Sequence, residues 1–457
     1  MKKIVIIGGG VAGAHAVTKL IDNGYPGELI TIIDMGKDPY QRKPEEVMSG
    51  WLGSGGFSDG KLTYHHMIGG QLSKYCGKEK AYQLMNEVIE TWKRFHPDPS
   101  KIMYSNPTEE PDFIKPYFGL RLFGVYHIGT DYLHEIGKRW YDYLVSKGVK
   151  FEWETKVVNI DFDENVLETL ETYQLDQPFA NTKVINYNTL IFAVGKSGID
   201  FAQSLAKQYE LPDEPKSVQI GVRFEAPQKH FQKLIDISYD FKLYRKFEDK
   251  GVSLRSFCTN NNAAYVAVEE TYGDYSYNGH AKKDPKYKND MTNFGILMEI
   301  NGIEDPFEWS RNVVNQCNVS VNIPPSHSPT GESFLYKAGL YYSPGFRQPS
   351  FTSENDPVRV IRLTELSKVV EAFGGYFDYI RDFIKDMKKV FPTLGDDFGI
   401  YIPEVKYVSA EPLVNYNDLS LTKYPNVYFA GDALSARGIT VAGSQGIYIA
   451  KSILNKN

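Results

Sequence analysis

The apolar residues at the start of the chain form a continuous run and then recur at helical spacing. The stretch KKIVIIGGG, residues 2–10, is a short β-branched run that ends in three glycines. Apolar side chains then recur three or four residues apart, at Val11, Ala14, Val17, Leu20 and Ile21. This pattern predicts a buried strand, a tight turn and a helix. The apolar run ELITIID, which ends at Asp34, predicts a second strand and completes a βαβ unit.

Two longer segments have the periodicity of helices. Residues 79–96 and 131–148 carry apolar side chains at helical spacing and stop at Pro97 and Gly148. The second segment leads into residues 149–187, whose alternation predicts a meander of strands.

Two apolar runs farther along the chain end in small residues. Residues 188–198, NTLIFAVGKSG, predict a strand that runs into a glycine turn. Residues 424–454 predict a strand that ends at Gly431 and Asp432 and a helix that follows it.

The region between these runs has a mixed pattern. Short strands are predicted at 218–226 and 293–300, and a helical stretch at 361–391. The order of elements predicts an α/β fold with a discontinuous Rossmann-like domain, residues 1–200 and 405–457. An α+β substrate or cap domain, residues 201–404, is predicted to be inserted into it.

Composition and charge narrow the class of protein. The 457 residues are 42% hydrophobic and 24% charged, which is typical of a packed globular chain of two or more domains. The net charge of −6 argues against a protein that coats nucleic acid. Three scattered cysteines predict a reducing cytoplasm, and no run approaches the about 18 apolar residues of a membrane span.

The first glycine turn has the spacing of a dinucleotide-binding loop. Gly8, Gly10 and Gly13 form G-x-G-x-x-G between a strand and a helix. Gly8 permits the tight turn, Gly10 lets the backbone approach a pyrophosphate, and Gly13 allows close packing of helix on strand. Asp34, at the end of the second strand, is positioned to accept the hydroxyls of an adenosine ribose.

This βαβ unit leaves FAD and NAD both open, and the C-terminal segment decides between them. A strand that ends at Asp432 before a helix is typical of FAD domains like that of glutathione reductase, where the aspartate meets the ribityl and phosphate region. The run into Ala193 and Gly195 agrees with the same order of elements. No second strand with G-x-G-x-x-G occurs in residues 201–404, which argues against a built-in NAD(P)H domain.

Four stretches together resemble a known family. GSGGFSDGKL (53–62), QIGVRFEAPQ (219–228), RSFCTNN (255–261) and GDALSARGI (431–439) are similar to motifs of the FAD-dependent, or NAD(FAD)-utilising, dehydrogenases, relatives of geranylgeranyl reductase-type flavoproteins. The chain departs from that family where Asn260, Asn261 and Asn262 stand in place of Pro-Gly-Gly.

The resemblance implies that GSGGFSDGKL passes close to the isoalloxazine of FAD. Gly53, Gly55 and Gly56 would let the main chain lie against the ring. A solvated surface loop is the alternative interpretation. The cofactor contacts implied by the motifs and the resemblance together are Gly8, Gly10, Val11, Ala12, Gly13, Asp34, Met35, Arg42, Gly55, Gly56, Phe57, Lys61, Leu62, Val157, Ala193, Gly195, Gly431, Asp432, Arg437, Gly438, Ile439 and Thr440.

The sequence gives a weaker signal for catalytic residues than for cofactor contacts, because no motif spacing identifies one. Lys61, Asp59, His65 and Cys258 are the candidates, with a buried, purely structural Cys258 and a solvated His65 as the alternatives. The histidine-containing stretches lack ligand partners at useful spacing, so no metal is predicted.

These observations predict an oxidoreductase with non-covalent FAD that transfers a hydride between flavin N5 and a small organic substrate. NAD(P)H is a candidate transient electron donor. The alternatives are a flavin oxidase or desaturase reoxidised by oxygen or another carrier, and a redox-silent flavin-binding partner protein. Neither the substrate nor the oligomeric state can be read from the sequence.

Overall fold

The structure of the chain is a computed structural model. It describes residues 1–43, 46–70, 72–107, 109–175, 182–214, 217–247, 250–271, 274–282, 288–317, 321–322, 335–336, 339–342, 359–360, 369–407 and 411–456. The chain divides into two compact units. Unit 1 comprises Met1–Tyr104, Gly124–Pro215 and Ser409–Asn457, and unit 2 comprises Ser105–Phe123 and Lys216–Val408.

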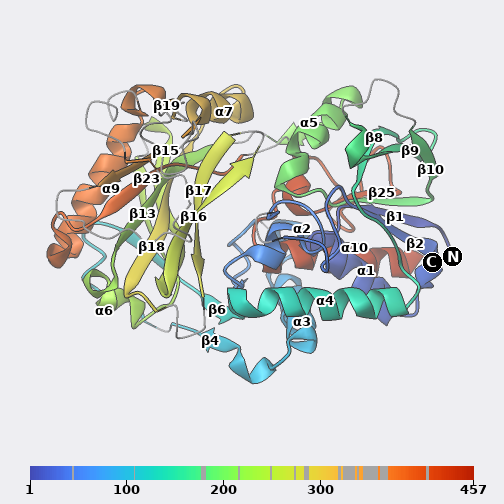
Figure 1. The fold of residues 1–457 in the computed structure, drawn as a ribbon, viewed down its shortest axis with the longest axis horizontal. Coiled ribbons are helices and arrows are strands. Elements are labelled where there is room, and N and C mark those ends of the chain that lie inside the picture. The colour runs from blue at the N-terminus through green and yellow to red at the C-terminus, as the bar shows by residue number, and fades with distance from the viewer. Residues whose placement is uncertain are drawn as a thin grey trace. The chain divides into compact units, whose positions relative to one another are not determined.

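Unit 1 is built on a five-stranded parallel sheet, drawn in Figure 1. In sheet order its strands are β25 (Val427–Phe429), β11 (Thr189–Phe192), β1 (Ile4–Ile7), β2 (Ile30–Ile33) and β7 (Lys150–Glu152). All four residues of the central strand β1 are buried, as expected where helices or other strands cover both faces of a parallel sheet. The predicted α/β class and the Rossmann-like sheet are therefore confirmed.

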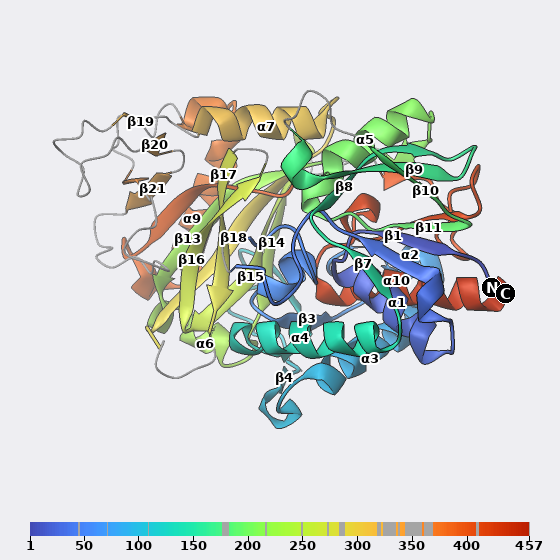
Figure 2. The same cartoon turned by 45° about the vertical axis from the view of Figure 1, so that its right-hand side comes forward.

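Two helices from opposite ends of the chain pack closely in unit 1. Helices α1 (Val11–Asp22) and α10 (Ile439–Lys456) lie side by side in both Figure 1 and Figure 2. A Cβ atom at Gly446 would lie 2.1 Å from the carbonyl oxygen of Ala12, so only glycine permits this approach. Helices α3 (Lys78–Phe95) and α4 (Thr130–Ser146) confirm the two predicted helices to within two residues.

Smaller elements complete unit 1. Strands β8 (Thr155–Asp161), β9 (Val166–Glu171) and β10 (Lys183–Asn186) form an antiparallel sheet, which confirms the predicted meander. A second three-stranded sheet is formed by β3 (Lys61–Tyr64), β6 (Gly124–His127) and β4 (Met103–Ser105). The other helices and strands are α2 (Leu72–Cys76), α5 (Ile199–Gln208), β12 (Asp213–Glu214) and β24 (Glu411–Pro412).

A buried histidine of helix α1 lies in the core of unit 1. His15 on α1 is 1% exposed, and its ring packs against Trp140 in a T-shaped arrangement with centroids 4.8 Å apart. Its Nδ1 lies 2.8 Å from the carbonyl oxygen of Val11. Desolvation lowers the pKa of His15 from its usual 6.5 to about 4, so the folded protein holds this ring neutral.

We expect His15 to make the folded state sensitive to mild acid. Between the pKa of the unfolded chain and the lower folded pKa, only the unfolded chain binds this proton, so stability falls as the pH falls through that window. In the wild type, we expect His15 to lower the unfolding free energy by about 2 kcal/mol when the pH falls from about 7 to about 5. His15→Leu should abolish this contribution. Denaturant melts of both proteins at the two pH values check this, and parallel pH dependences would contradict it.

Unit 2 is built on an eight-stranded sheet. In sheet order its strands are β22 (Arg359–Val360), β21 (Gly339–Tyr342), β23 (Gly399–Val405), β13 (Val218–Pro227), β18 (Met291–Ile300), β15 (Val252–Asn262), β14 (Phe241–Phe247) and β5 (Gly119–Leu122). The other elements of the unit are α6 (Gln232–Ile235), α7 (Pro306–Cys317), α9 (Phe377–Val390), β16 (Ala264–Thr271), β17 (Asp274–Ala281), β19 (Val321–Asn322) and β20 (Leu335–Tyr336).

The strands predicted at 218–226 and 293–300 are confirmed as β13 and β18. Within the helical stretch predicted at 361–391, helix α9 is confirmed, and residues 361–368 lie outside the described residues. Relative to the expected domain boundaries, residues 105–123 and 405–408 belong to unit 2 and residues 201–215 to unit 1. Within the described part of the chain, no helix is long and apolar enough to cross a membrane.

Candidate functional site

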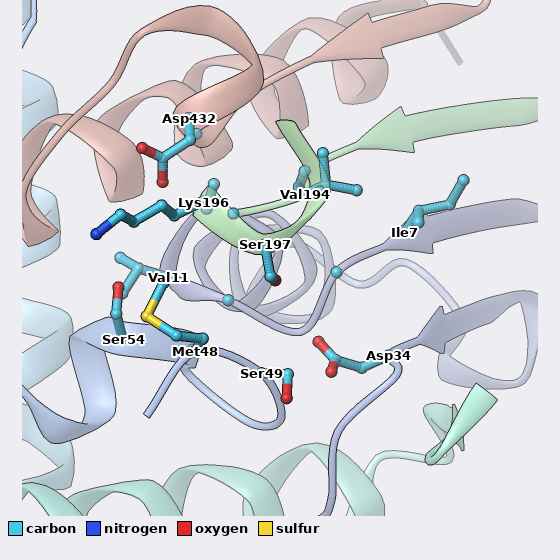
Figure 3. Close-up of a pocket in the computed structure, with 18 of the residues that line it drawn as sticks. Ile7, Val11, Asp34, Met48, Ser49, Ser54, Val194, Lys196, Ser197 and Asp432 are labelled. Atoms are coloured by element: carbon cyan, nitrogen blue, oxygen red, sulfur yellow. The ribbon is translucent and has the colours of Figure 1, made fainter. Parts of the chain in front are cut away.

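A cavity of about 230 Å³ lies in unit 1, where several strands and loops end. Figure 3 shows the side chains around it, with Lys196 and Asp432 at one end and Asp34 and Ser49 at the other. The cavity is lined by Ile7, Gly8, Gly10, Val11, Ala12, Ile33, Asp34, Met35, Met48, Ser49, Leu52, Gly53, Ser54, Gly55, Ser58, Thr155, Lys156, Val157, Ala193, Val194, Gly195, Lys196, Ser197, Gly198, Asp200, Phe201, Gly431, Asp432, Ala436, Gly438, Ile439 and Ala442.

The N-terminus of α1 opens onto this cavity. Gly10 is the N-cap residue, and no side chain caps the helix there. A Cβ atom at Gly10 would meet nothing within 4 Å, so the space beside its backbone is open. The first N–H groups of a helix carry partial positive charge and point outward, which makes this a suitable site for an anion.

The other two glycines of the loop have structural roles. Gly8 has a φ of +101°, and a Cβ atom there would lie 2.4 Å from the carbonyl oxygen of Ala193 on the neighbouring strand. At Gly13, a Cβ atom would lie 2.2 Å from the carbonyl oxygen of Gly8. The helix therefore packs against its own turn, and Gly10 is the glycine whose missing side chain leaves open space.

Asp34 is held rigidly at the end of β2. Its Oδ2 accepts a hydrogen bond from the N–H of Gly9, and its Oδ1 accepts from the N–H groups of Gly36 and Gly50, each at 2.8 Å. The carboxylate has roughly four acceptor sites, so these three bonds leave room for about one more. Asp34 therefore fastens the glycine loop and still lines the cavity.

Arg42 organises the chain that follows Asp34. Its guanidinium donates to the carbonyl oxygens of Glu46, Val47, Trp51 and Gly53 at 2.6–2.9 Å. Its Cζ lies 4.3 Å from the centroid of the Phe57 ring. Burial lowers the pKa of Arg42 to about 10, although nearby Asp34 and Glu46 raise it. Arg42 does not line the cavity, and its contacts are those of a clamp on the loop.

The stretch GSGGFSDGKL packs against the start of α1. Its first residues form a short 3₁₀ helix, Gly53–Phe57. A Cβ atom at Gly55 would lie 2.3 Å from Cγ2 of Val11, so this glycine is required for close packing. Gly53, Ser54, Gly55 and Ser58 line the cavity, whereas Gly56 and Phe57 do not.

The charged residues of the same stretch face the protein interior. Lys61 Nζ lies 2.8 Å from Asp59 Oδ2, and the two side chains are 4% and 10% exposed. His127, opposite Lys61 on β6, lies with its Nε2 3.0 Å from the carbonyl oxygen of Asp59. Asp59, Lys61 and Leu62 are buried and do not line the cavity. The ion pair therefore stabilises the loop internally, and the contact of His127 with the backbone of Asp59 ties the loop to β6.

The C-terminal segment forms another wall of the cavity. Gly431 donates its N–H to Gln445 Oε1 at 2.9 Å, which ties the end of β25 to α10. Asp432 lines the cavity, and its Oδ1 lies 3.5 Å from Nε of Arg437. Gly438 and Ile439 also line the cavity, whereas Arg437 and Thr440 do not.

Val157, Ala193, Gly195 and Met35, expected from the motifs and the resemblance, are brought to the same cavity. His65 is elsewhere in unit 1, stacked on His66 with ring centroids 5.1 Å apart, and it does not line the cavity.

Several lining residues are missing from the sequence-based set. Met48, Ser49 and Lys156 have no motif that signals them. Lys196 and Ser197 directly follow Gly195 at the end of a strand, and this position could have revealed them.

Cys258 belongs to unit 2, at an irregularity of β15 between Phe257 and Asn260. Its φ is +52°, an uncommon value for a residue other than glycine. Its carbonyl oxygen accepts a hydrogen bond from Nη2 of Arg223 at 2.7 Å. The stretches QIGVRFEAPQ and RSFCTNN therefore meet inside unit 2, through the backbone of Cys258.

A network of buried polar groups surrounds this contact. Arg223 is 0% exposed, donates to Asn293 Oδ1 at 2.6 and 2.9 Å, and lies 3.4 Å from a carboxylate oxygen of Glu404. Tyr401 donates a hydrogen bond to Glu225 on the same face of the sheet. On the opposite face, Phe224 and its neighbours form an apolar layer. Around Arg223 and Phe224, the unit 2 sheet thus buries polar groups on one face and aromatic rings on the other.

Across the described residues, no group of three or more His, Cys, Asp or Glu side chains is arranged to hold a metal ion.

Comparison with solved structures finds similarity at low sequence identity. No family model and no curated protein matches the chain. A flavoprotein/dehydrogenase from Cytophaga hutchinsonii is 12% identical, with a TM-score of 0.38, over 100% of this chain and 79% of that one. L-proline dehydrogenase from P. horikoshii is 11% identical, with a TM-score of 0.39, over 100% and 94% of the two chains. Glycine oxidase from Bacillus cereus ATCC 14579 is 10% identical, with a TM-score of 0.39, over 100% and 96%.

Proposed function

We propose that this protein is an FAD-dependent oxidoreductase that binds FAD non-covalently in the cavity of unit 1. The observation that carries the proposal is the uncapped N-terminus of α1 beside the open space at Gly10. A diphosphate is a good occupant of such a site, because its charge is stabilised by helix N–H groups and its bulk needs the space that a side chain would fill.

The residues around the cavity fit the rest of a dinucleotide. Asp34, with acceptor capacity left and a fixed orientation, would accept a hydroxyl of the adenosine ribose. Asp432, across the cavity in Figure 3, would accept hydroxyls of the ribityl chain. The seryl hydroxyls of Ser49, Ser54 and Ser197 add further hydrogen-bonding groups to the walls.

Bound FAD would supply hydride transfer at its flavin, and the chain would supply binding, orientation and electrostatics. The substrate is a small organic molecule whose identity the cavity does not define. NADH or NADPH is the proposed electron donor. The cavity is not lined by Lys61, Asp59, His65 or Cys258. We therefore assign none of these four residues a catalytic role.

We expect the purified protein to be yellow and to contain FAD in about a one-to-one ratio with the chain. Acid or heat denaturation should release all of it, because the proposed binding is non-covalent. Absorption spectra of the supernatant and the precipitate, with chromatography of the released flavin, check this. A colourless protein that does not take up added FAD would contradict the proposal.

Anaerobic reduction distinguishes the kinds of flavoprotein. We expect NADH or NADPH to bleach the flavin of a dehydrogenase or reductase. Bleaching by neither nucleotide, but by an organic substrate with reoxidation by air, would indicate an oxidase or desaturase. Bleaching by none of these would indicate a flavoprotein in which FAD is structural.

A further inference from the structure

The charge around the cavity is not what a diphosphate alone would favour. Three carboxylates line it, from Asp34, Asp200 and Asp432, against the two ammonium groups of Lys156 and Lys196. A diphosphate carries negative charge of its own, so a cation close to the phosphates would strengthen the binding that the helix N-terminus provides.

The two lysines lie at different parts of the cavity wall. Lys156 follows Thr155, whose N–H donates to the carbonyl oxygen of Asp34 at 3.0 Å, so it belongs to the Asp34 end. Lys196 begins the short 3₁₀ helix Lys196–Gly198 after β11, and Figure 3 shows its side chain extended toward the end that carries Asp432 and Ser54.

Lys196 also follows the strand next to the glycine loop. β11 pairs in parallel with β1, with Phe192 opposite Ile7, so the chain segments after both strands leave the sheet at the same edge. The segment after β1 carries Gly8 and Gly10, and the segment after β11 carries Gly195 and Lys196. This pairing brings Lys196 to the cavity wall on the segment that follows the strand beside the helix N-terminus.

We propose that Lys196 binds the diphosphate of the cofactor, together with the N-terminus of α1. This inference rests on the proposed function. Together with Arg437, whose Nε lies 3.5 Å from Asp432 Oδ1, Lys196 offsets the negative charge of Asp432 at this end of the cavity, so a carboxylate that suits sugar hydroxyls does not repel the neighbouring phosphates. Because the side chain is half-buried in a polar cavity, its replacement should change binding with little effect on folding.

The experiment compares ADP with adenosine, which share the base and the ribose and differ in the diphosphate. Titration calorimetry on the flavin-free protein measures both affinities for the wild type, Lys196→Gln, Lys196→Arg and Lys156→Gln. We expect Lys196→Gln to weaken ADP about tenfold or more and adenosine less than about twofold. Lys196→Arg should recover most of the ADP affinity, and the salt dependence of ADP binding should be smaller in Lys196→Gln than in the wild type. Lys156→Gln, the control at the Asp34 end, should leave the ratio of the two affinities near that of the wild type.

Two results would overturn this inference and leave the proposed function intact: wild-type ADP affinity in Lys196→Gln, or equal losses for ADP and adenosine. Equal losses would mean that Lys196 only shapes the cavity. A wild-type protein that binds neither FAD nor ADP would overturn the proposed function and, with it, the role of Lys196.

Discussion

Gly10→Val is expected to abolish FAD binding while the chain stays folded. The backbone of Gly10 has φ −66° and ψ −177°, an extended conformation open to any residue, and nothing lies within 4 Å of the position that a Cβ atom would take. A valine side chain would therefore fill the space beside the first N–H groups of α1 without a clash inside the protein. The flavin-to-protein absorbance ratio after gel filtration, and the thermal melt of the flavin-free protein, measure the two effects.

Gly13→Ala is the matched control in the same helix. Gly10→Val should lose FAD and keep the fold, whereas Gly13→Ala should destabilise the fold. A Cβ atom at Gly13 would lie 2.2 Å from the backbone oxygen of Gly8, so this substitution is expected to lower the melting temperature. A Gly10→Val protein that still held stoichiometric FAD would remove the helix N-terminus from the cofactor site.

Lys61→Met is expected to cost about 3–5 kcal/mol of unfolding free energy, because it leaves the carboxylate of Asp59 buried without its cation. The two side chains are nearly inaccessible, so water cannot replace the lost partner. The double variant Lys61→Met with Asp59→Asn should recover much of the loss, since it buries no charge. Denaturant unfolding of the three proteins measures the effect.

An exposed ion pair provides the control for Lys61. Lys115 and Asp112 lie 2.7 Å apart with side chains 59% and 91% exposed, and Lys115→Met should leave the denaturation midpoint nearly unchanged. If Lys61→Met behaved in the same way, the buried pair would not anchor the loop.

The same pair adds a dependence on acid. Burial by itself raises the pKa of Asp59, but the charge and hydrogen bond of Lys61 outweigh it and lower the pKa below the usual 3.8. A depressed folded pKa contributes stability that is present above the unfolded pKa and is lost as the pH falls through the folded pKa. Asp59 therefore affects stability only in strong acid, below the window in which His15 acts.

The sequence alone determined the βαβ unit, its glycines, and the order of elements that completes the parallel sheet. These features follow from local rules. An apolar run before a glycine turn makes a buried strand, and apolar spacing of three or four makes a helix, whatever the rest of the chain does. The lining positions Gly10, Asp34, Gly195 and Asp432 follow for the same reason, since each lies at the carboxyl end of a recognisable parallel strand and those ends share one edge.

Only the tertiary structure decided which polar side chains face the cavity and which face the interior. Lys61 and Arg42 are cations near glycines, as a cofactor ligand would be, but strand β6 and the carbonyl groups of the loop surround them. The position of Lys196 directly after Gly195 can be read from the sequence, but it reaches the cavity because β11 pairs with β1. The contact between Arg223 and the backbone of Cys258 likewise depends on strands that are distant in sequence. A side chain's partner across a sheet is set by the pairing of segments far apart in the chain, and the local pattern of a sequence carries no information about that pairing.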